Sequence, residues 1–168
     1  MKKAVFVVSQ NMFRDEELFE AKEELDNAGI ETKVASLTKE TATGKLGGTV
    51  KPDLAINEIS AKDFDAIVFV GGGGSTVYFG NQAALKLARE FFEKKKIVAA
   101  ICIAPSILAN AGILKGKKAT VFGTEHRNIE EKGATYTDER VTVDGKIITA
   151  NGPAAAHEFG QKIVEALS

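Results

Sequence analysis

The sequence predicts an α/β fold in which a mostly parallel sheet carries helices on both faces. Short runs of continuous apolar residues, typical of strands covered on both sides, alternate with longer segments whose apolar residues recur at helical spacing. This alternation indicates βαβ units, in which consecutive strands run parallel. The 168 residues fit a single domain, 1–168, because domains cluster at about 100–150 residues.

The first half of the chain is expected to supply two strands, a helix and an irregular segment. The helix has the clearest pattern, because Leu18, Ala21 and Leu25 recur on one face and Gly29 follows as the residue that ends it. In order, the expected elements are a strand at 3–8, a helix at 15–28, a strand at 31–36 and a loop or small hairpin at 41–59.

The second half continues the alternation of strands and helices. Asp144-Gly145 is a strong two-residue hairpin turn, so the segment 141–149 is expected to fold back on itself. In order, the expected elements are a strand at 64–70, a helix at 81–94, a strand at 97–101, a short helix at 105–111, a strand at 119–122, a loop containing GTEHRN, strands at 135–136 and 141–149, and a closing helix at 153–167.

The charge balance of the chain excludes two classes of partner. Lys and Arg together number 22 against 23 Asp and Glu, which gives a net charge of -1. Proteins that bind nucleic acid or an acidic membrane surface need an excess of basic side chains. No apolar run approaches the ~20 residues of a membrane-spanning helix. We therefore expect neither nucleic acid nor a membrane as a partner.

The chain has a single cysteine, Cys102, so it cannot form an intrachain disulfide. This fits a reducing compartment, and we expect a cytoplasmic protein. The opening MKKAVFVVSQ has a charged start, but its apolar run is too short for a secretory signal.

Cys102 lies where a buried strand meets a short helix. Ala100 and Ala104 flank it, and small residues at these positions allow the backbone to turn sharply around a nucleophile. Pro105 suits the first turn of a helix, whose N-terminus would lower the pKa of a nearby thiol. A free cysteine is also among the most buried residue types and often only fills space. The residues alone leave both interpretations open, a nucleophile and a core residue.

Four glycines at 71–74 follow the strand at 64–70. Their spacing fits neither G-x-G-x-x-G nor G-x-x-x-x-G-K-[ST], which disfavours a nucleotide phosphate loop. A flexible turn and a close backbone approach, whose N–H groups receive an oxyanion, both remain open. Asp15, Glu16 and Glu17 begin a helix, where their charge offsets the helix dipole. Spacing alone marks none of these three as catalytic.

Several segments together resemble the ThiJ/PfpI superfamily, which contains the parkinsonism-associated deglycase and the PfpI intracellular peptidases. Residues 13–18, FRDEEL, are similar to its F-x-D-x-E-L segment, and residues 99–105, AAICIAP, are similar to its A-x-I-C-x-G-P elbow. The resemblance covers nearly the full chain. Further similar segments lie at 28–30, 34–36, 108, 111–112, 114–116, 143–146, 149, 152–153 and 159.

The resemblance implies a flavodoxin-like three-layer sandwich with a nucleophile elbow, assembled as a homodimer or a higher homo-oligomer. It implies that Cys102 is the nucleophile and that Glu17 is the buried acid that hydrogen-bonds it and exchanges a proton with it. Gly71 and Gly72 match the family's glycine turn, and the N–H groups of Gly72 and Ile103 would form an oxyanion hole. We expect neither a cofactor nor a metal.

The chain departs from the family pattern beside the nucleophile. The peptidase-like members carry His there, whereas this chain has Ile103, so the base that would activate attack on an amide is missing. Of the two histidines, His126 is a candidate third member of the site or a surface loop residue, and His157 on the final helix is expected to be structural. Val70 and Ala104 replace a proline and a glycine of the family.

These residues point to an enzyme of the glyoxalase or deglycase type that acts on reactive dicarbonyls, with methylglyoxal as the example. An aldehyde is electrophilic enough to react without a histidine, which agrees with Ile103. One alternative is a redox-sensing stress protein or chaperone that acts through oxidation of Cys102. A PfpI-type cysteine peptidase is a further alternative, ranked below both.

Overall fold

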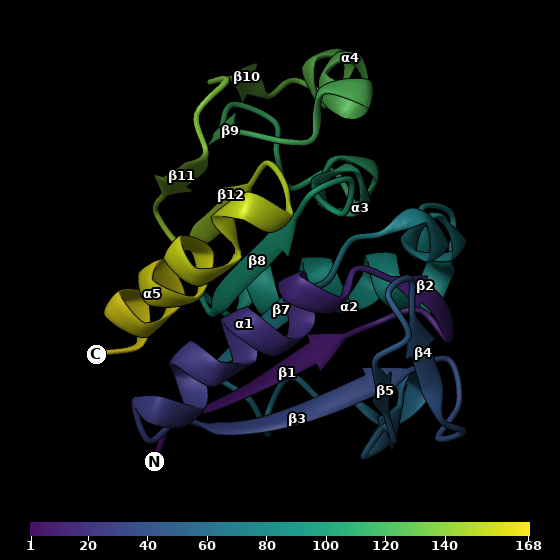
Figure 1. Ribbon diagram of the computed structural model, residues 1–168. Coiled ribbons are helices and arrows are strands. Elements are labelled where there is room, and N and C mark those ends of the chain that lie inside the picture. Colours follow the sequence, from purple (N-terminus) through teal and green to yellow (C-terminus); the bar gives the residue numbers. More distant parts are fainter.

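The computed structural model describes residues 1–168, and its centre is a seven-stranded sheet (Figure 1). All neighbouring strands are parallel except the last two of the chain, which form a hairpin. The predicted α/β fold with a mostly parallel sheet is confirmed. Across the sheet, the strands lie in the order β11 (Val141–Asp144), β12 (Ile147–Ala150), β8 (Ile97–Ile101), β7 (Ala66–Phe69), β1 (Lys3–Val7), β3 (Glu31–Ser36) and β6 (Leu54–Ala55).

The order of the parallel strands determines where a ligand site is expected. Apart from the two-residue edge strand β6, the parallel strands taken along the chain are β1, β3, β7, β8 and β12, and they lie in the flavodoxin-like order 2-1-3-4-5. After β1, the chain first adds β3 on one side of it and later adds β7 on the other side. In open α/β sheets, ligands bind outside the carboxyl ends of the strands at such a reversal.

Each face of the sheet has its own apolar core, because successive strand side chains point to opposite faces. In β1, Val5 and Val7 belong to one core, and Ala4 and Phe6 belong to the other. Figure 1 shows the helices in two layers, one on each side of the sheet. The Ala4 side is covered by α1 (Asp15–Asn27) and α5 (Ala156–Leu167), and the Val5 side by α2 (Gln82–Glu93) and α3 (Pro105–Asn110).

The segment 41–59, expected as a loop or small hairpin, contains a hairpin and also a strand of the main sheet. Its strands β4 (Ala42–Gly44) and β5 (Thr49–Val50) are antiparallel, and they join β2 (Asn11–Phe13) in a small sheet of three strands. The segment then supplies β6, the edge strand of the main sheet. These strands are two or three residues long, which is too short to produce a visible alternation in the sequence.

The region after the nucleophile candidate differs from the expectation. A strand was expected at 119–122, but β9 (Lys118–Ala119) is shorter and pairs in parallel only with β10 (Thr135–Tyr136). The loop expected around His126 is wrong, because that residue begins the helix α4 (His126–Glu131). Ile129 is the only buried residue of α4, so this helix has no apolar periodicity to reveal it.

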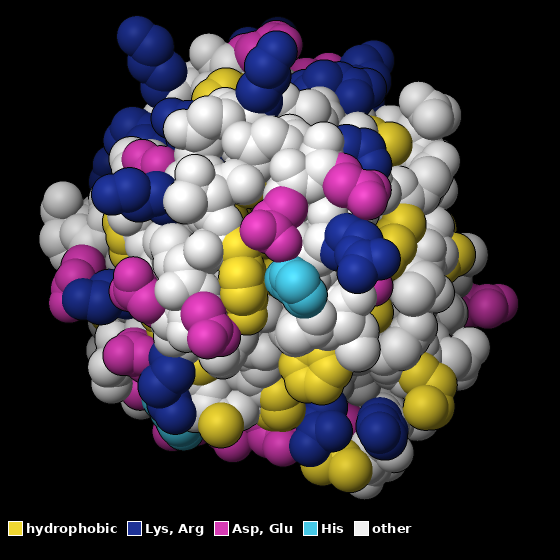
Figure 2. Space-filling model, turned by 90° about the horizontal axis from the view of Figure 1, so that it is seen from above, with side chains coloured by type: hydrophobic (Ala, Val, Ile, Leu, Met, Phe, Trp, Pro, Cys, Tyr) yellow, Lys and Arg dark blue, Asp and Glu magenta, His cyan; other side chains and the backbone are white.

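Charges of both signs are mixed on the face of the molecule in Figure 2, and hydrophobic side chains lie there in small separate groups. No helix of the structure combines the length and the apolar character needed to cross a membrane. Four short 3-10 helices complete the backbone: η1 (Ile56–Glu58), η2 (Gly73–Tyr78), η3 (Gly123–Glu125) and η4 (Pro153–Ala155).

Candidate active site

Cys102 follows the carboxyl end of β8 in a backbone conformation that is unusual for a residue with a side chain. Its φ is 65°, in the left-handed region, which costs about 1–3 kcal/mol for most residues. Neighbouring backbone holds it there: Cys102 N–H donates to Ala150 O at 2.9 Å, and Phe122 N–H donates to Cys102 O at 2.8 Å. Ala104 is fully buried beneath the turn. The structure therefore has the sharp strand-to-helix turn that presents a side chain at the edge of a sheet.

Glu17 lies in the first turn of α1 and has no exposed surface. Its Oε1 accepts a hydrogen bond from Gly71 N–H at 3.0 Å. Its Oε2 is buried and has no hydrogen-bond partner. A buried carboxylate oxygen without a donor is costly, and a proton on that oxygen removes the cost.

Gly71 is the point at which three parts of the chain meet. A Cβ on Gly71 would lie 2.6 Å from Cys102 Cβ and 2.6 Å from Glu17 Oε1. The absence of a side chain at this position is what lets the thiol and the carboxyl approach each other. The structure therefore brings together Glu17, Gly71 and Cys102 from α1, the end of β7 and the end of β8.

Two backbone N–H groups lie beside the sulfur. Hydrogen bonds from the N–H groups of Gly72 and Ile103 favour the thiolate and act to lower the pKa of Cys102. Gly72 has a φ of 98°, which glycine adopts without strain. A Cβ there would lie 2.4 Å from Arg14 N. A residue other than glycine would therefore have a strained backbone at this position and would also collide with Arg14. This pair has the arrangement expected for an oxyanion hole.

Burial has the largest effect on the protons of this site. It raises the pKa of Glu17 from its ordinary 4.5 to about 8. Burial, followed by the negative charge of Glu17, raises the pKa of Cys102 to about 12. The lowered thiol pKa expected from the helix N-terminus is therefore wrong, because burial and the charge of Glu17 outweigh the hydrogen bonds from Gly72 and Ile103 that favour the thiolate.

The three acidic residues at the start of α1 have three different surroundings. Asp15 accepts hydrogen bonds from Leu46 N–H and Gly48 N–H, each at 2.8 Å, and so fixes the turn between β4 and β5. Glu16 forms an ion pair with Arg14 near the surface, at 2.9 Å. Glu17 alone is turned into the site. Sequence spacing gave no means of separating these roles.

Arg14 is a charged neighbour of the site that sequence reasoning missed. Its backbone N–H donates to Gly71 O at 3.0 Å, and its positive charge acts to lower the pKa of Glu17. The only sequence signal was its place inside FRDEEL, where nothing distinguished it from a surface residue.

The structure does not bring either histidine to Cys102. His126 is half-exposed on α4, where its Nδ1 lies 2.9 Å from Glu130 Oε1 and its ring contacts the ring of Tyr136. His157 on α5 pairs with Glu20 and Glu24 of α1, which agrees with a structural role. No group of three or more His, Cys, Asp or Glu side chains is placed to hold a metal ion.

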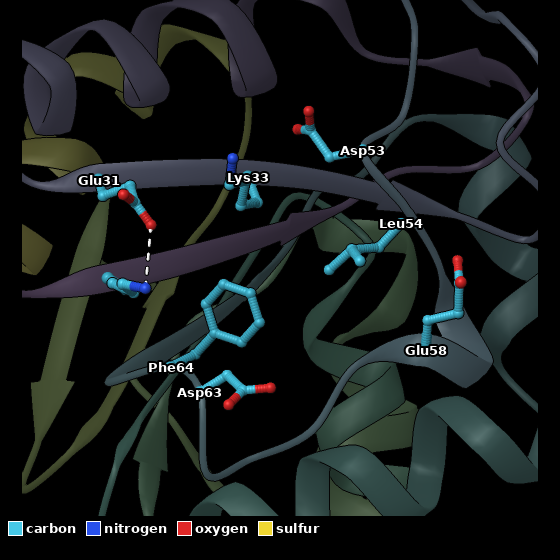
Figure 3. Close-up of a pocket in the computed structure, with 8 residues that line it drawn as sticks. Glu31, Lys33, Asp53, Leu54, Glu58, Asp63 and Phe64 are labelled. Carbon is cyan, nitrogen blue, oxygen red and sulfur yellow. Dashed lines mark ion pairs between the residues drawn. The ribbon is translucent and has the colours of Figure 1, made fainter.

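A cavity of about 420 Å³ lies away from this site (Figure 3). Lys3 and Glu31 on its wall begin β1 and β3, so this part of it is at the opposite edge of the sheet from Cys102, and their side chains form an ion pair at 3.3 Å. Its other lining residues are Lys33, Asp53, Leu54, Glu58, Asp63 and Phe64. Since ligands of such sheets bind at the carboxyl ends of the strands, the candidate site remains at Cys102.

Comparison with known proteins identifies relatives across the whole chain. The model of the DJ-1/PfpI family matches residues 2–166. An uncharacterised protein of Methanocaldococcus jannaschii, MJ0967, is 42% identical over 98% of this chain and 82% of its own. The deglycase TK1284 of Thermococcus kodakarensis is 35% identical over 97% of this chain and 98% of its own.

Two further comparisons bear on the fold and on the range of activities among relatives. The crystal structure of a ThiJ/PfpI domain protein from Brachyspira murdochii is 39% identical, with a TM-score of 0.96 over 98% of this chain and 95% of that one. A protein of Bacillus subtilis named putative cysteine protease YraA is 31% identical over 99% of both chains.

Proposed function

The chain belongs to the DJ-1/PfpI family, and on that premise we propose that it is a cofactor-free enzyme of the glyoxalase or deglycase type. In this proposal it acts on reactive dicarbonyls such as methylglyoxal, with Cys102 as the nucleophile and Glu17 as the acid and base. The observation that carries the proposal is the buried, unpartnered Oε2 of Glu17 beside a buried thiol. The relative named as a deglycase supports the same class of reaction.

The first step is addition of sulfur to the aldehyde carbon. When the pair loses one proton, the proton that remains can reside on Glu17 Oε2 and leave the negative charge on Cys102. The sulfur–carbon bond then forms, the C=O π bond opens, and the negative charge passes to oxygen. The N–H groups of Gly72 and Ile103 stabilise that charge in the protein interior, where a hydrogen bond is worth more than in water.

The second step is the movement of a proton between the two carbons of the substrate. Glu17 first gives its proton to the oxyanion, which completes the hemithioacetal and leaves a carboxylate. The carboxylate then takes the proton from the former aldehyde carbon and returns it to the neighbouring carbon, while the hydroxyl proton passes to the neighbouring oxygen, which converts the hemithioacetal into a thioester. A pKa of about 8 suits this role, because a group that both accepts and donates works best near the operating pH. Water then cleaves the thioester, releasing lactate and restoring the thiol.

The test is the formation of lactate from methylglyoxal by purified protein. Cys102→Ala is expected to abolish it, and Glu17→Gln is expected to reduce it by at least about 100-fold, the lower end of what general acid–base catalysis contributes. Glu16→Gln is the matched control and is expected to retain activity. Lactate formation by wild type that does not exceed that of Cys102→Ala would refute the proposal.

A cysteine peptidase is a second candidate, favoured by the name of the Bacillus subtilis relative. The residue next to Cys102 is Ile103, and neither histidine contacts the thiol, so amide attack has no base other than Glu17. We expect no cleavage of fluorescent casein by protein from two independent purifications. Cleavage that disappears in Cys102→Ala would favour the peptidase instead.

Redox sensing through Cys102 remains a second role for the same thiol. A protonated Glu17 next to the sulfur can donate a hydrogen bond to a sulfinate oxygen, which favours this stage of oxidation. Mass spectrometry after mild peroxide treatment tests this directly. A Cys102 that stays unmodified excludes sensing and leaves the enzymatic proposal untouched.

We also propose a homodimer or higher homo-oligomer and a cytoplasmic location. The resemblance to the family supports the assembly, and a single cysteine without a disulfide partner supports the reducing compartment. Light scattering of the purified protein tests the assembly, and a monomer at micromolar concentration would contradict it.

A further inference from the structure

Arg14 lies immediately before α1, one helical turn ahead of Glu17. Its backbone N–H donates to Gly71 O at 3.0 Å, and a Cβ on Gly72 would lie 2.4 Å from the same nitrogen. Residues three positions apart at the start of a helix lie on the same side of it. Arg14 therefore sits against the glycine turn that also contacts Glu17 and Cys102.

The guanidinium group of Arg14 is held in a fixed plane with one edge free. Its Nε lies 2.9 Å from Glu16 Oε1, and its Nη2 lies 3.0 Å from Glu16 Oε2. Both side chains are 28% exposed, so the pair is partly shielded from water. Nη1 donates no hydrogen bond to the protein. A guanidinium that is already oriented, with a free nitrogen, is well suited to bind a carboxylate or a phosphate.

The charge of Arg14 reaches the reacting pair. Arg14 acts to lower the pKa of Glu17, and negative charge on Glu17 and on Cys102 acts to raise the pKa of Arg14. The positive charge of Arg14 therefore acts at the sulfur, and it would attract a negatively charged reagent that approaches Cys102.

We propose that Arg14 also lets the site bind aldehydes that carry a carboxylate directly beside the reacting carbonyl, of which glyoxylate is the smallest, as reversible covalent ligands of Cys102. This inference rests on the proposed function, because it requires Cys102 to add to a carbonyl carbon. The carboxylate binds Arg14 while sulfur bonds to the aldehyde carbon, the C=O π bond opens, and the thiol proton ends on oxygen. The product is a hemithioacetal, and nothing is oxidised or reduced.

The first test compares alkylation of Cys102 by iodoacetate and by iodoacetamide, which carry a carboxylate and a neutral amide at the same place. In both reactions a sulfur–carbon bond forms, the carbon–iodine bond breaks and iodide leaves. Both reagents require the same thiolate. The ratio of their rate constants is therefore independent of any change in the pKa of Cys102, and it reports recognition of the anion alone.

Arg14→Gln is expected to lower the iodoacetate-to-iodoacetamide ratio by about tenfold, the effect of one partly shielded charge pair. Arg14→Lys keeps the charge and is expected to retain part of the ratio. Arg89→Gln, which removes one positive charge from α2 on the other face of the sheet, is the matched control and is expected to leave it unchanged. An Arg14→Gln ratio equal to that of wild type overturns the proposal.

The second test uses the aldehydes themselves. Glyoxylate and the neutral glyoxal are each added before iodoacetamide, and protection of Cys102 is measured by mass spectrometry. Arg14→Gln is expected to lose protection by glyoxylate and to keep protection by glyoxal. Equal protection by glyoxylate in both proteins overturns the proposal. Neither test requires turnover, so a failure to form lactate from methylglyoxal is distinguishable from a failure of anion recognition.

Discussion

The side chains of Glu17 and Cys102 lose their protons as a pair, because both are buried and each responds to the charge of the other. The pair loses its first proton near the raised pKa of Glu17, about 8. It loses its second proton near the raised pKa of Cys102, about 12. Between these values a single negative charge is shared by the carboxyl and the sulfur. The reactivity of the thiol therefore depends on how that charge is divided.

Removal of the carboxyl is expected to change the number of steps in the pH profile of Cys102 alkylation. Wild type is expected to show two rises, one near pH 8 and one approaching pH 12. Glu17→Gln leaves only the thiol to titrate and is expected to show one. Glu16→Gln is the control and is expected to keep both. Two rises in Glu17→Gln would contradict the coupling.

Gly71 and Gly73 provide a matched pair of glycines two residues apart. A Cβ on Gly71 meets Cys102 and Glu17 at 2.6 Å, whereas a Cβ on Gly73 meets nothing within 4 Å. Gly71→Ala is expected to lower the free energy of unfolding by about 1–3 kcal/mol, as overpacking does, and to remove activity with methylglyoxal. Gly73→Ala is expected to change neither. Urea denaturation with the lactate assay measures both, and an active, stable Gly71→Ala would contradict the packing at this point.

At the level of elements, the small sheet of β2, β4 and β5 is attached to the start of α1 by Asp15. The carboxylate accepts two backbone N–H groups from the turn between β4 and β5, at Leu46 and Gly48. Glycines 44 and 48 give it room, since a Cβ on either would lie 2.5–2.6 Å from the carboxyl group. The turn is thereby fixed next to the helix that supplies Glu17.

Asp15→Ala is expected to release this turn while leaving the main sheet folded. Two hydrogen bonds to a charged group are lost, which predicts a destabilisation of about 2–4 kcal/mol. Hydrogen exchange at the amides of Leu46 and Gly48 is expected to accelerate most. Glu16→Ala breaks only a partly exposed ion pair and serves as the control, with a change of at most about 1 kcal/mol. Unchanged exchange at both amides would show that Asp15 does not hold the turn.

The elements that could be predicted from the sequence are those long enough to show a period. Buried strands and amphipathic helices supplied the α/β fold, but α4 was missed because Ile129 is its only buried side chain. The position of Cys102 after a strand was also predictable. The difference between Glu16 and Glu17 was not, because it arises from burial against Gly71, a residue far away in the chain.

At the level of the whole molecule, Glu17 makes stability depend on pH. Its pKa rises from 4.5 to about 8 on folding, so the folded state holds the proton more tightly than the unfolded state. Below pH 4.5 Glu17 is protonated in both the folded and the unfolded state, and its full contribution to the free energy of unfolding is present. As the pH rises from 4.5 to about 8, the unfolded state gains stability by losing its proton, and the stabilisation of the fold is lost.

Comparison of wild type with Glu17→Gln across this range is expected to isolate the effect. The free energy of unfolding of wild type is expected to fall relative to the variant by up to about 1.4 kcal/mol for each pH unit. The substitution leaves every other ionisable side chain in place, so their contribution cancels in the difference. Urea denaturation at several pH values measures it, and a constant difference between the two proteins would show that Glu17 is ionised in the folded state.

The hydrogen bond from Cys102 N–H to Ala150 O also sets an order of assembly. Its acceptor belongs to β12, which leaves the ribosome long after the elbow itself. The pairing that supports the left-handed turn at Cys102 is therefore a late, long-range event in folding. A nascent or C-terminally truncated chain that lacks β12 would carry its only thiol without this support, open to oxidants and to other chains. A strand that is synthesised after the elbow thus completes the surroundings of Cys102.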